Sequence, residues 1–343
     1  MRSPRLAWAW PPIGLAALTV AMIAGAAAGA ASITPVDIAG ELASRLPFGV
    51  ESPLSERQLA VLVELRLPRV VLGAMVGGLL AIAGAAYQGV FRNPLADPYL
   101  LGAAGGAGLG ATLVIAYGND LFDGPRALVP VAAFAGALIG VITAYALGAS
   151  AGHGGTASLV LAGVAVSSFL SAVQTLVQMT ESDELRRIYS WVLGGLGRGG
   201  WSDVRMILPY AVVSVAVLLA CGYLLDLLAL GDEKATSLGL NATVVRLIVI
   251  SAASLGTAAA VSVSGLIGFV GIVVPHIVRR LVGTGYRLIL PMSLLAGGAF
   301  LVLVDIVART LISPAELPLG VVTAFLGAPF FVFILRTTRN QSM

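Results

Sequence analysis

The chain has 343 residues, of which 58% are hydrophobic and only 11% are charged, and its net charge is +3. A soluble domain carries roughly 25% charged residues, and a soluble chain of this length could not bury so much apolar surface. The composition therefore excludes an ordinary soluble protein, and the scattered basic residues give no run that would favour nucleic acid. The sequence predicts an all-α integral membrane protein.

The first apolar run follows Arg2 and Arg5 and ends in small residues near position 33. This pattern is similar to a secretory signal peptide with its cleavage site. The run is nevertheless long enough to cross a bilayer, which requires about 20 apolar residues. We expect an uncleaved first membrane helix, and a cleaved signal peptide is the alternative.

No soluble domain interrupts the later apolar runs, so residues 1–343 are expected to form a single transmembrane domain. About ten spanning helices are predicted, near residues 12–33, 68–89, 99–117, 128–150, 158–179, 204–229, 243–264, 266–282, 289–311 and 318–336. An even number of spans places both termini on one side. With that side taken as cytoplasmic, the Lys and Arg residues divide evenly between the two sides, but the short loops favour this orientation.

Glycine is abundant inside the apolar runs, with 42 residues in the chain. Gly102, Gly106 and Gly110 recur every four residues, and Gly73 and Gly77 repeat this spacing. Small residues at such spacing let membrane helices approach one another closely. The pattern predicts tight helix packing.

Several signatures of other activities fail. The string GLGRGG at 195–200 follows no predicted strand, so it does not indicate a dinucleotide site. The chain contains no P-loop, and its only lysine is Lys234. His153 and His276 are far apart, and Cys221 lies alone in an apolar run. We therefore predict no metal site, no cofactor and no intrachain disulfide in this chain.

Few charged residues fall near the centres of the predicted spans. Asp305 and Arg309 are four residues apart near one span end, where they can pair, and Asp226 lies near another end. An ion-coupled secondary transporter would carry buried acids near the bilayer midplane. This class is therefore only the alternative, and an intramembrane enzyme would require a catalytic cluster that the sequence does not contain.

The segment GDEKATSLGLNATVVR, at 231–246, predicts a short helix between two spans. Asp232 can cap it and Gly239 can end it, while Ala235 and Leu238 give it a small apolar face. It is either a plain connecting turn or a docking helix for a cytoplasmic partner.

From about residue 55 onward, the chain resembles the FecCD family, the membrane-spanning permeases of ABC importers for iron chelates, haem and cobalamin. The resemblance is carried by the blocks RLPR (66–69), QGVFRNPLADPYLLG (88–102), LAGVAVS (161–167), YSWVLGGLG (189–197), SGLIGFVGIVVPHIVR (264–279) and DIVARTLISPAELPLGVVTAFLGAPFF (305–331).

The resemblance implies a type II ABC importer permease fold in the bacterial inner membrane, with both termini cytoplasmic. The permease would form a homodimer and move a metal chelate by alternating access. Two separate subunits would bind ATP–Mg and hydrolyse it, and an extracytoplasmic substrate-binding protein would deliver the cargo. The chain itself would not be an enzyme. An iron–siderophore is the first expected cargo, followed by cobalamin and haem.

The resemblance also assigns residues to three sites. Arginines of the binding-protein docking site would be Arg66, Arg69 and Arg309. The cytoplasmic gate would contain Asn93, Leu95, Thr156 and Ala157, the last replacing a hydroxyl residue found in some relatives. The coupling helix near 231–243 would contact the ATPase through Asp232, Glu233, Lys234, Leu238 and Gly239.

Overall fold

The computed structural model describes residues 9–29, 31–45, 51–121, 128–150, 156–197 and 199–339, and these contain helices but no strands. The first half comprises α2 (Trp10–Ala27), α3 (Pro35–Ser44), α4 (Glu56–Ala60), the π-helix η1 (Val61–Arg66), α5 (Leu67–Phe91), α6 (Ala103–Leu121), α7 (Leu128–Ser150) and α8 (Thr156–Thr180). The second half comprises the 3-10 turn η3 (Ser182–Glu184), α9 (Leu185–Val192), α10 (Trp201–Ala220), α11 (Gly222–Ala229), α12 (Asp232–Ser237), α13 (Ala242–Ser264), α14 (Val270–Val282), α15 (Tyr286–Thr310) and α16 (Leu319–Arg339).

Seven of the described helical segments are long and apolar enough to cross a membrane. These are α2, the continuous segment 56–91, α7, α8, α10, α13 and α15. Two shorter apolar stretches lie in α6 and α16, and α14 has 13 residues. The predicted all-helical, multi-pass membrane fold is confirmed, whereas the count of ten spanning helices stays a prediction. Met1 and Met343 lie outside the described residues.

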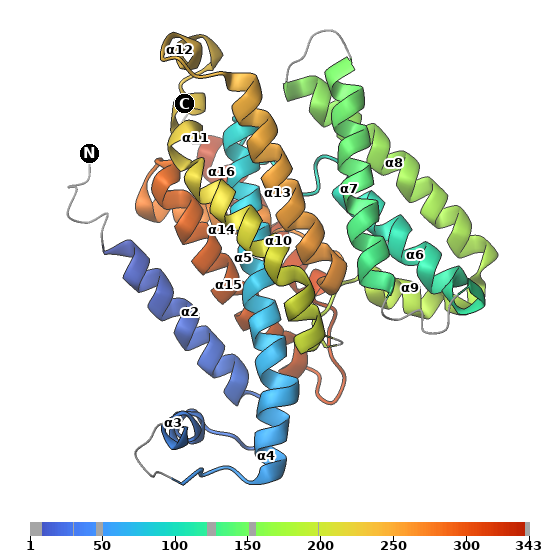
Figure 1. The fold of residues 1–343 in the computed structure, drawn as a ribbon, viewed down its shortest axis with the longest axis vertical. Coiled ribbons are helices and arrows are strands. Elements are labelled where there is room, and N and C mark those ends of the chain that lie inside the picture. The colour runs from blue at the N-terminus through green and yellow to red at the C-terminus, as the bar shows by residue number, and fades with distance from the viewer. Residues whose placement is uncertain are drawn as a thin grey trace.

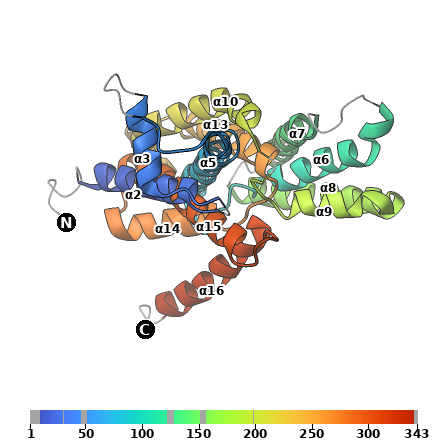
Figure 2. The same cartoon turned by 90° about the horizontal axis from the view of Figure 1, so that it is seen from below.

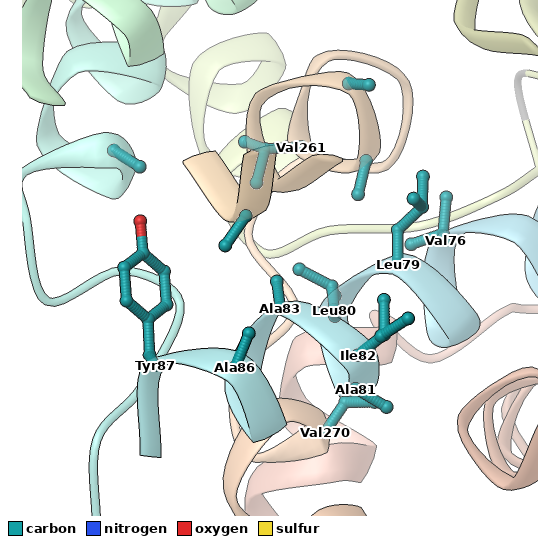
Figure 3. Close-up of a cluster of buried hydrophobic side chains, with 14 of the residues drawn as sticks. Val76, Leu79, Leu80, Ala81, Ile82, Ala83, Ala86, Tyr87, Val261 and Val270 are labelled. Atoms are coloured by element: carbon teal, nitrogen blue, oxygen red, sulfur yellow. The ribbon is translucent and has the colours of Figure 1, made fainter. Parts of the chain in front are cut away.

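Helix α5 runs through the middle of the bundle, with α2, α10, α13, α14 and α15 packed around it (Figures 1 and 2). Every residue from Val76 to Phe91 is buried, because neighbouring helices cover α5 on all sides there. The buried cluster in Figure 3 joins Leu79 and Ile82 of α5 to Val261 of α13 and Val270 of α14. α5 is therefore the core element of this bundle.

Helices α6, α7, α8 and α9 lie together on one side of the molecule in both views (Figures 1 and 2). The predicted glycine ladder lies in the contact between α6 and α7. A Cβ atom on Gly106 would clash with the carbonyl oxygen of Gly136, and one on Gly110 would clash with that of Ala132. The tight packing predicted from the glycine spacing is confirmed at these positions.

The backbone is unwound between α13 and α14, at residues 265–269. Gly265 and Phe269 both have φ near +67°, a conformation that ends one helix and delays the next. The Tyr99 hydroxyl accepts a hydrogen bond from Ile267 N (3.2 Å) and donates one to Ile267 O (3.0 Å). α14 consequently begins at Val270, four residues later than the predicted span, and Pro275 lies within it as predicted.

We predict opposite effects for two glycine-to-alanine changes on α5. A Cβ on Gly84 would run into the backbone carbonyl of Gly271, whereas one on Gly73 meets the Leu196 Cδ1 atom at 3.2 Å. Gly84→Ala should destabilise the protein by about 1–3 kcal/mol, since backbone atoms cannot yield as a side chain can.

Gly73→Ala is the matched control on the same helix. It should be neutral or slightly stabilising, because alanine favours helix formation over glycine by about 1 kcal/mol. Thermal unfolding of both variants in the same detergent measures the difference. Equal melting temperatures would contradict the close backbone contact between α5 and α14.

Candidate functional site

The residues predicted to form the docking site, the gate and the coupling helix lie at two opposite ends of the bundle. The three arginines lie at the end near α3 and α4, and α12 lies at the opposite end (Figure 1). We call these the arginine end and the α12 end.

Arg66 ends η1 and is only 6% exposed. Its guanidinium donates to the carbonyl oxygens of Ala26 (3.0 Å), Ala27 (2.9 Å) and Ala31 (2.6 Å). The last four carbonyls of any helix lack partners within that helix and carry partial negative charge. Arg66 therefore caps the C-terminus of α2.

Arg309, in the last turn of α15, contacts the same helix end. It donates to Gly25 O at 2.6 Å and to Ala28 O at 3.1 Å. Its Nε also lies 3.4 Å from Asp305 Oδ2, so the predicted pair four residues apart on α15 is present. Two guanidiniums thus share the carbonyls that end α2.

Arg69, in the first turn of α5, is held by two carboxylates. Its Nε and Nη2 donate to Asp305 at 2.9–3.1 Å, while Nη1 and Nη2 donate to Glu316 at 2.8 and 3.0 Å. The Asp305 side chain is 3% exposed and that of Glu316 is 47% exposed. The hydrogen bond from Arg69 lowers the pKa of Glu316, which lies in the turn before α16.

The three arginines predicted to dock a partner are therefore brought together, and all three guanidiniums have acceptors within the chain. Arg66 and Arg309 point inward to backbone carbonyls, and Arg69 reaches the surface beside Glu316. Docking stays a prediction. Glu316 was not predicted from the sequence, although an acidic residue seven positions after Arg309, between two predicted spans, was an available signal.

At the α12 end, the turn after α5 contains two of the predicted gate residues. Asn93 Oδ1 accepts a hydrogen bond from Leu95 N at 2.9 Å, and the Leu95 side chain is exposed. The other two, Thr156 and Ala157, begin α8 at the same end of the molecule. The structure thus places both pairs at one end of the molecule, one in the turn after α5 and the other at the start of α8.

The predicted connecting helix is present as α12. Its C-terminus has the hydrogen bonds of a Schellman motif, with Gly239 N donating to Thr236 O and Leu240 N to Ala235 O. Gly239 has φ +83°, so it ends the helix as predicted.

Two details of α12 differ from the sequence-based expectation. Asp232 does not cap the helix, because Gly231 takes the cap position and the Asp232 carboxylate instead contacts Arg92 and Arg246. Ala235 is fully buried whereas Leu238 is 61% exposed, so these residues do not form one exposed apolar face. Glu233, Lys234 and Leu238 remain exposed.

The described residues hold no group of three or more His, Cys, Asp or Glu side chains suited to a metal ion. His153 lies outside them, and His276 accepts a hydrogen bond from Arg280 Nε at 3.3 Å. Cys221 is buried between α10 and α11, as its apolar surroundings in the sequence indicated.

Comparisons with known proteins agree with this architecture. The model of the FecCD transport family matches residues 17–337. A cobalamin import system permease protein (BtuC) of Halobacterium salinarum is 44% identical over 88% of this chain and 79% of its own length. The hemin transport system permease protein HmuU of Yersinia pestis is 40% identical over 81% of this chain and 84% of its own.

The solved inward-facing conformation of a metal-chelate type ABC transporter has the same fold. It superposes with a TM-score of 0.82 at 28% identity, covering 98% of this chain and all of that one. The family match and the shared fold define a multi-pass membrane permease. The chain belongs to the FecCD transport family.

We predict that Asp305 contributes far more to stability than Glu316. Asp305→Asn leaves Arg69 and Arg309 with reduced compensation in a buried site, where loss of one charge partner costs about 3–5 kcal/mol. Glu316→Gln removes a half-exposed partner of the same arginine, and such pairs contribute about 0–1 kcal/mol.

Thermal unfolding of the two variants in one detergent tests this difference. Asp305→Asn should lower the melting temperature markedly and Glu316→Gln only slightly. Similar melting temperatures for the two variants would show that the buried carboxylate does not hold α5, α15 and the end of α2 together.

Proposed function

We propose that this chain is the permease of an ATP-driven importer that carries a bulky metal chelate across a cell membrane. The supporting observation is membership of the FecCD family over nearly the whole chain. Two copies form the pathway, two ATP-binding subunits contact the α12 end, and an extracytoplasmic binding protein docks at the arginine end. The permease opens alternately to each side and catalyses no covalent reaction.

The proposed orientation places the α12 end, and with it both chain termini, in the cytoplasm. Ten membrane-spanning segments satisfy this arrangement when α6, α14 and α16 are counted with the seven long apolar helical segments. In lipid, a segment too short to cross by itself is tolerated where neighbouring helices bury it. In this arrangement the gate residues and α12 face the same aqueous compartment.

The cargo class is supported by relatives named for cobalamin, hemin and Fe(3+)-citrate import. An apolar cavity of about 630 Å³ lies between the end of α9, the unwound segment 265–269 and α16. An apolar wall offers few directional hydrogen bonds, so it can pass chelates of different shape without binding any of them tightly. Such a wall suits a large chelate that is recognised mainly by the binding protein. We propose an iron–siderophore first, then cobalamin and haem. The ion-coupled alternative has no support, since Asp305 is paired at a helix end.

The test of this function is reconstitution in liposomes with and without an ATP-binding subunit and a binding protein. The chain alone should neither hydrolyse ATP nor accumulate cargo, whereas the assembled importer should take up one of the three radiolabelled chelates. ATP hydrolysis by the chain alone would overturn the proposal, as would uptake driven by a proton or sodium gradient.

We predict that Leu238→Asp uncouples the importer. Leu238 is the large apolar residue exposed on the α12 segment, and a carboxylate there would be desolvated against an ATPase groove without a partner. Co-purification of the ATP-binding subunit and uptake should both fall by about tenfold, which corresponds to ~1.4 kcal/mol.

The matched control is Leu230→Asp, a leucine of similar exposure (53% against 61% for Leu238) that precedes α12. It should leave co-purification near the level of the parent chain. Equal losses in both variants would indicate a general effect of the new charge and would remove Leu238 from the proposed contact.

Docking at the arginine end is predicted to depend on Arg69. Glu316 occupies the outer nitrogen atoms of Arg69, the same atoms that a partner carboxylate would use. Glu316→Gln should therefore strengthen binding-protein affinity by about two- to fivefold, and more at low ionic strength, where screening is weakest.

Asp183→Asn is the control, because it removes one exposed negative charge from the η3 turn without a described partner. Affinities are measured at two salt concentrations on immobilised importer. The same change in both variants would assign the effect to overall charge, and no change in either would leave Arg69 with a structural role alone.

A further inference from the structure

The α12 end contains an ion-pair cluster that joins three separate elements. The Oδ1 atom of Asp232, the first residue of α12, accepts a hydrogen bond from Arg246 Nη2 on α13. The same oxygen lies 3.5 Å from Arg92 Nη2 at the end of α5. One carboxylate therefore connects α12 both to a long helix and to the turn that holds Asn93 and Leu95.

The turn on the other side of this contact is well fixed to α5. Arg92 has a left-handed backbone conformation (φ 50°), and Asn93 N donates to Gln88 O at 3.2 Å. Asn93 O and Oδ1 then accept bonds from Ala96 N (3.1 Å) and Leu95 N (2.9 Å). These hydrogen bonds hold the backbone of the turn together. A displacement of the Arg92 guanidinium would therefore move the whole turn.

The α12 side of the contact has few other polar attachments. Gly231, with φ +103°, forms the link to α11, and Ala235 is the buried residue of α12. The Arg246 side chain is 16% exposed, and its described anionic partner is Asp232. The Nε atom of Arg246 is buried without a hydrogen-bond partner. Among the described residues, Asp232 is the charged connection between α12 and the rest of the bundle.

We propose that Asp232 is a positioning residue that transmits displacement of α12 to the 92–96 turn through Arg92. The inference rests on the proposed function, in which α12 contacts an ATP-binding subunit and the turn belongs to the cytoplasmic gate. When the subunit moves α12, the carboxylate draws Arg92 and the end of α5 with it. Removal of the Arg92 guanidinium leaves α12 itself unchanged but separates its motion from that of the turn.

The single cysteine of the chain permits a direct measurement. In a Cys221→Ala background, Leu95→Cys places one thiol in the exposed turn. Its rate of reaction with a membrane-impermeant maleimide is followed in the assembled importer, with and without ATP. Asp232→Asn and Arg92→Gln are introduced singly and together, and Arg280→Gln serves as the control because it removes an exposed cation at the same end.

We expect ATP to change the labelling rate in the parent, and each single variant to reduce that change about fivefold, the lower end of typical coupling between sites. The double variant should be no worse than either single one, since both remove the same link. Arg280→Gln should respond as the parent does, and co-purification of the ATP-binding subunit should persist in Arg92→Gln and Arg280→Gln, because both residues lie outside α12.

Two outcomes separate this inference from the proposed function. If no ATP-binding subunit associates with the parent, the proposed function fails. If the subunit associates and Asp232→Asn keeps the full response to ATP, the positioning role is wrong. Should Asp232→Asn lose the subunit, Arg92→Gln decides, because Arg92 lies outside α12: a reduced response supports the link and a full response overturns it.

Discussion

Helices in lipid gain little from burying apolar side chains against one another, because the lipid tails are equally apolar. Their association depends on direct contact, and here that contact is backbone against backbone. Gly84 of α5 meets the Gly271 carbonyl of α14, Gly77 meets Gly297 of α15, and Gly106 of α6 meets Gly136 of α7. α5 can be enclosed on all sides only because its neighbours approach this closely. The remaining features of the molecule are arranged around that enclosed helix.

Charged residues are accordingly placed where α5 emerges. At one end, Arg69 and Asp305 tie α5 to α15, while Arg66 and Arg309 hold the last carbonyls of α2. At the other end, Arg92 connects the end of α5 to α12 through Asp232. Both polar clusters thus include a residue at or next to a terminus of the same rigid helix.

Local patterns in the sequence were sufficient for much of this. Runs of apolar residues located the long helices, the spacing of Gly106 and Gly110 predicted tight helix packing without naming the partner helix, and the four-residue separation predicted the pair Asp305–Arg309. The resemblance grouped the three arginines without giving their partners. Arg66 and Arg309 donate to carbonyls of α2, which are remote in sequence and carry no side-chain signal. Asp232 does not cap α12 as its position suggested, because its carboxylate pairs with Arg92 and Arg246, which are remote in sequence.

The short length of α14 has a consequence for how the protein enters the membrane. Its 13 residues extend about 20 Å at 1.5 Å per residue, less than the roughly 30 Å hydrocarbon core. The unwound residues 265–269 that precede it expose backbone groups, and the Ile267 groups find partners only when Tyr99 is already in place. We therefore expect α14 to insert late, into a site formed beforehand by α5, against which it packs, and the segment containing Tyr99. The order of the chain satisfies this requirement, since both of those elements are synthesised first.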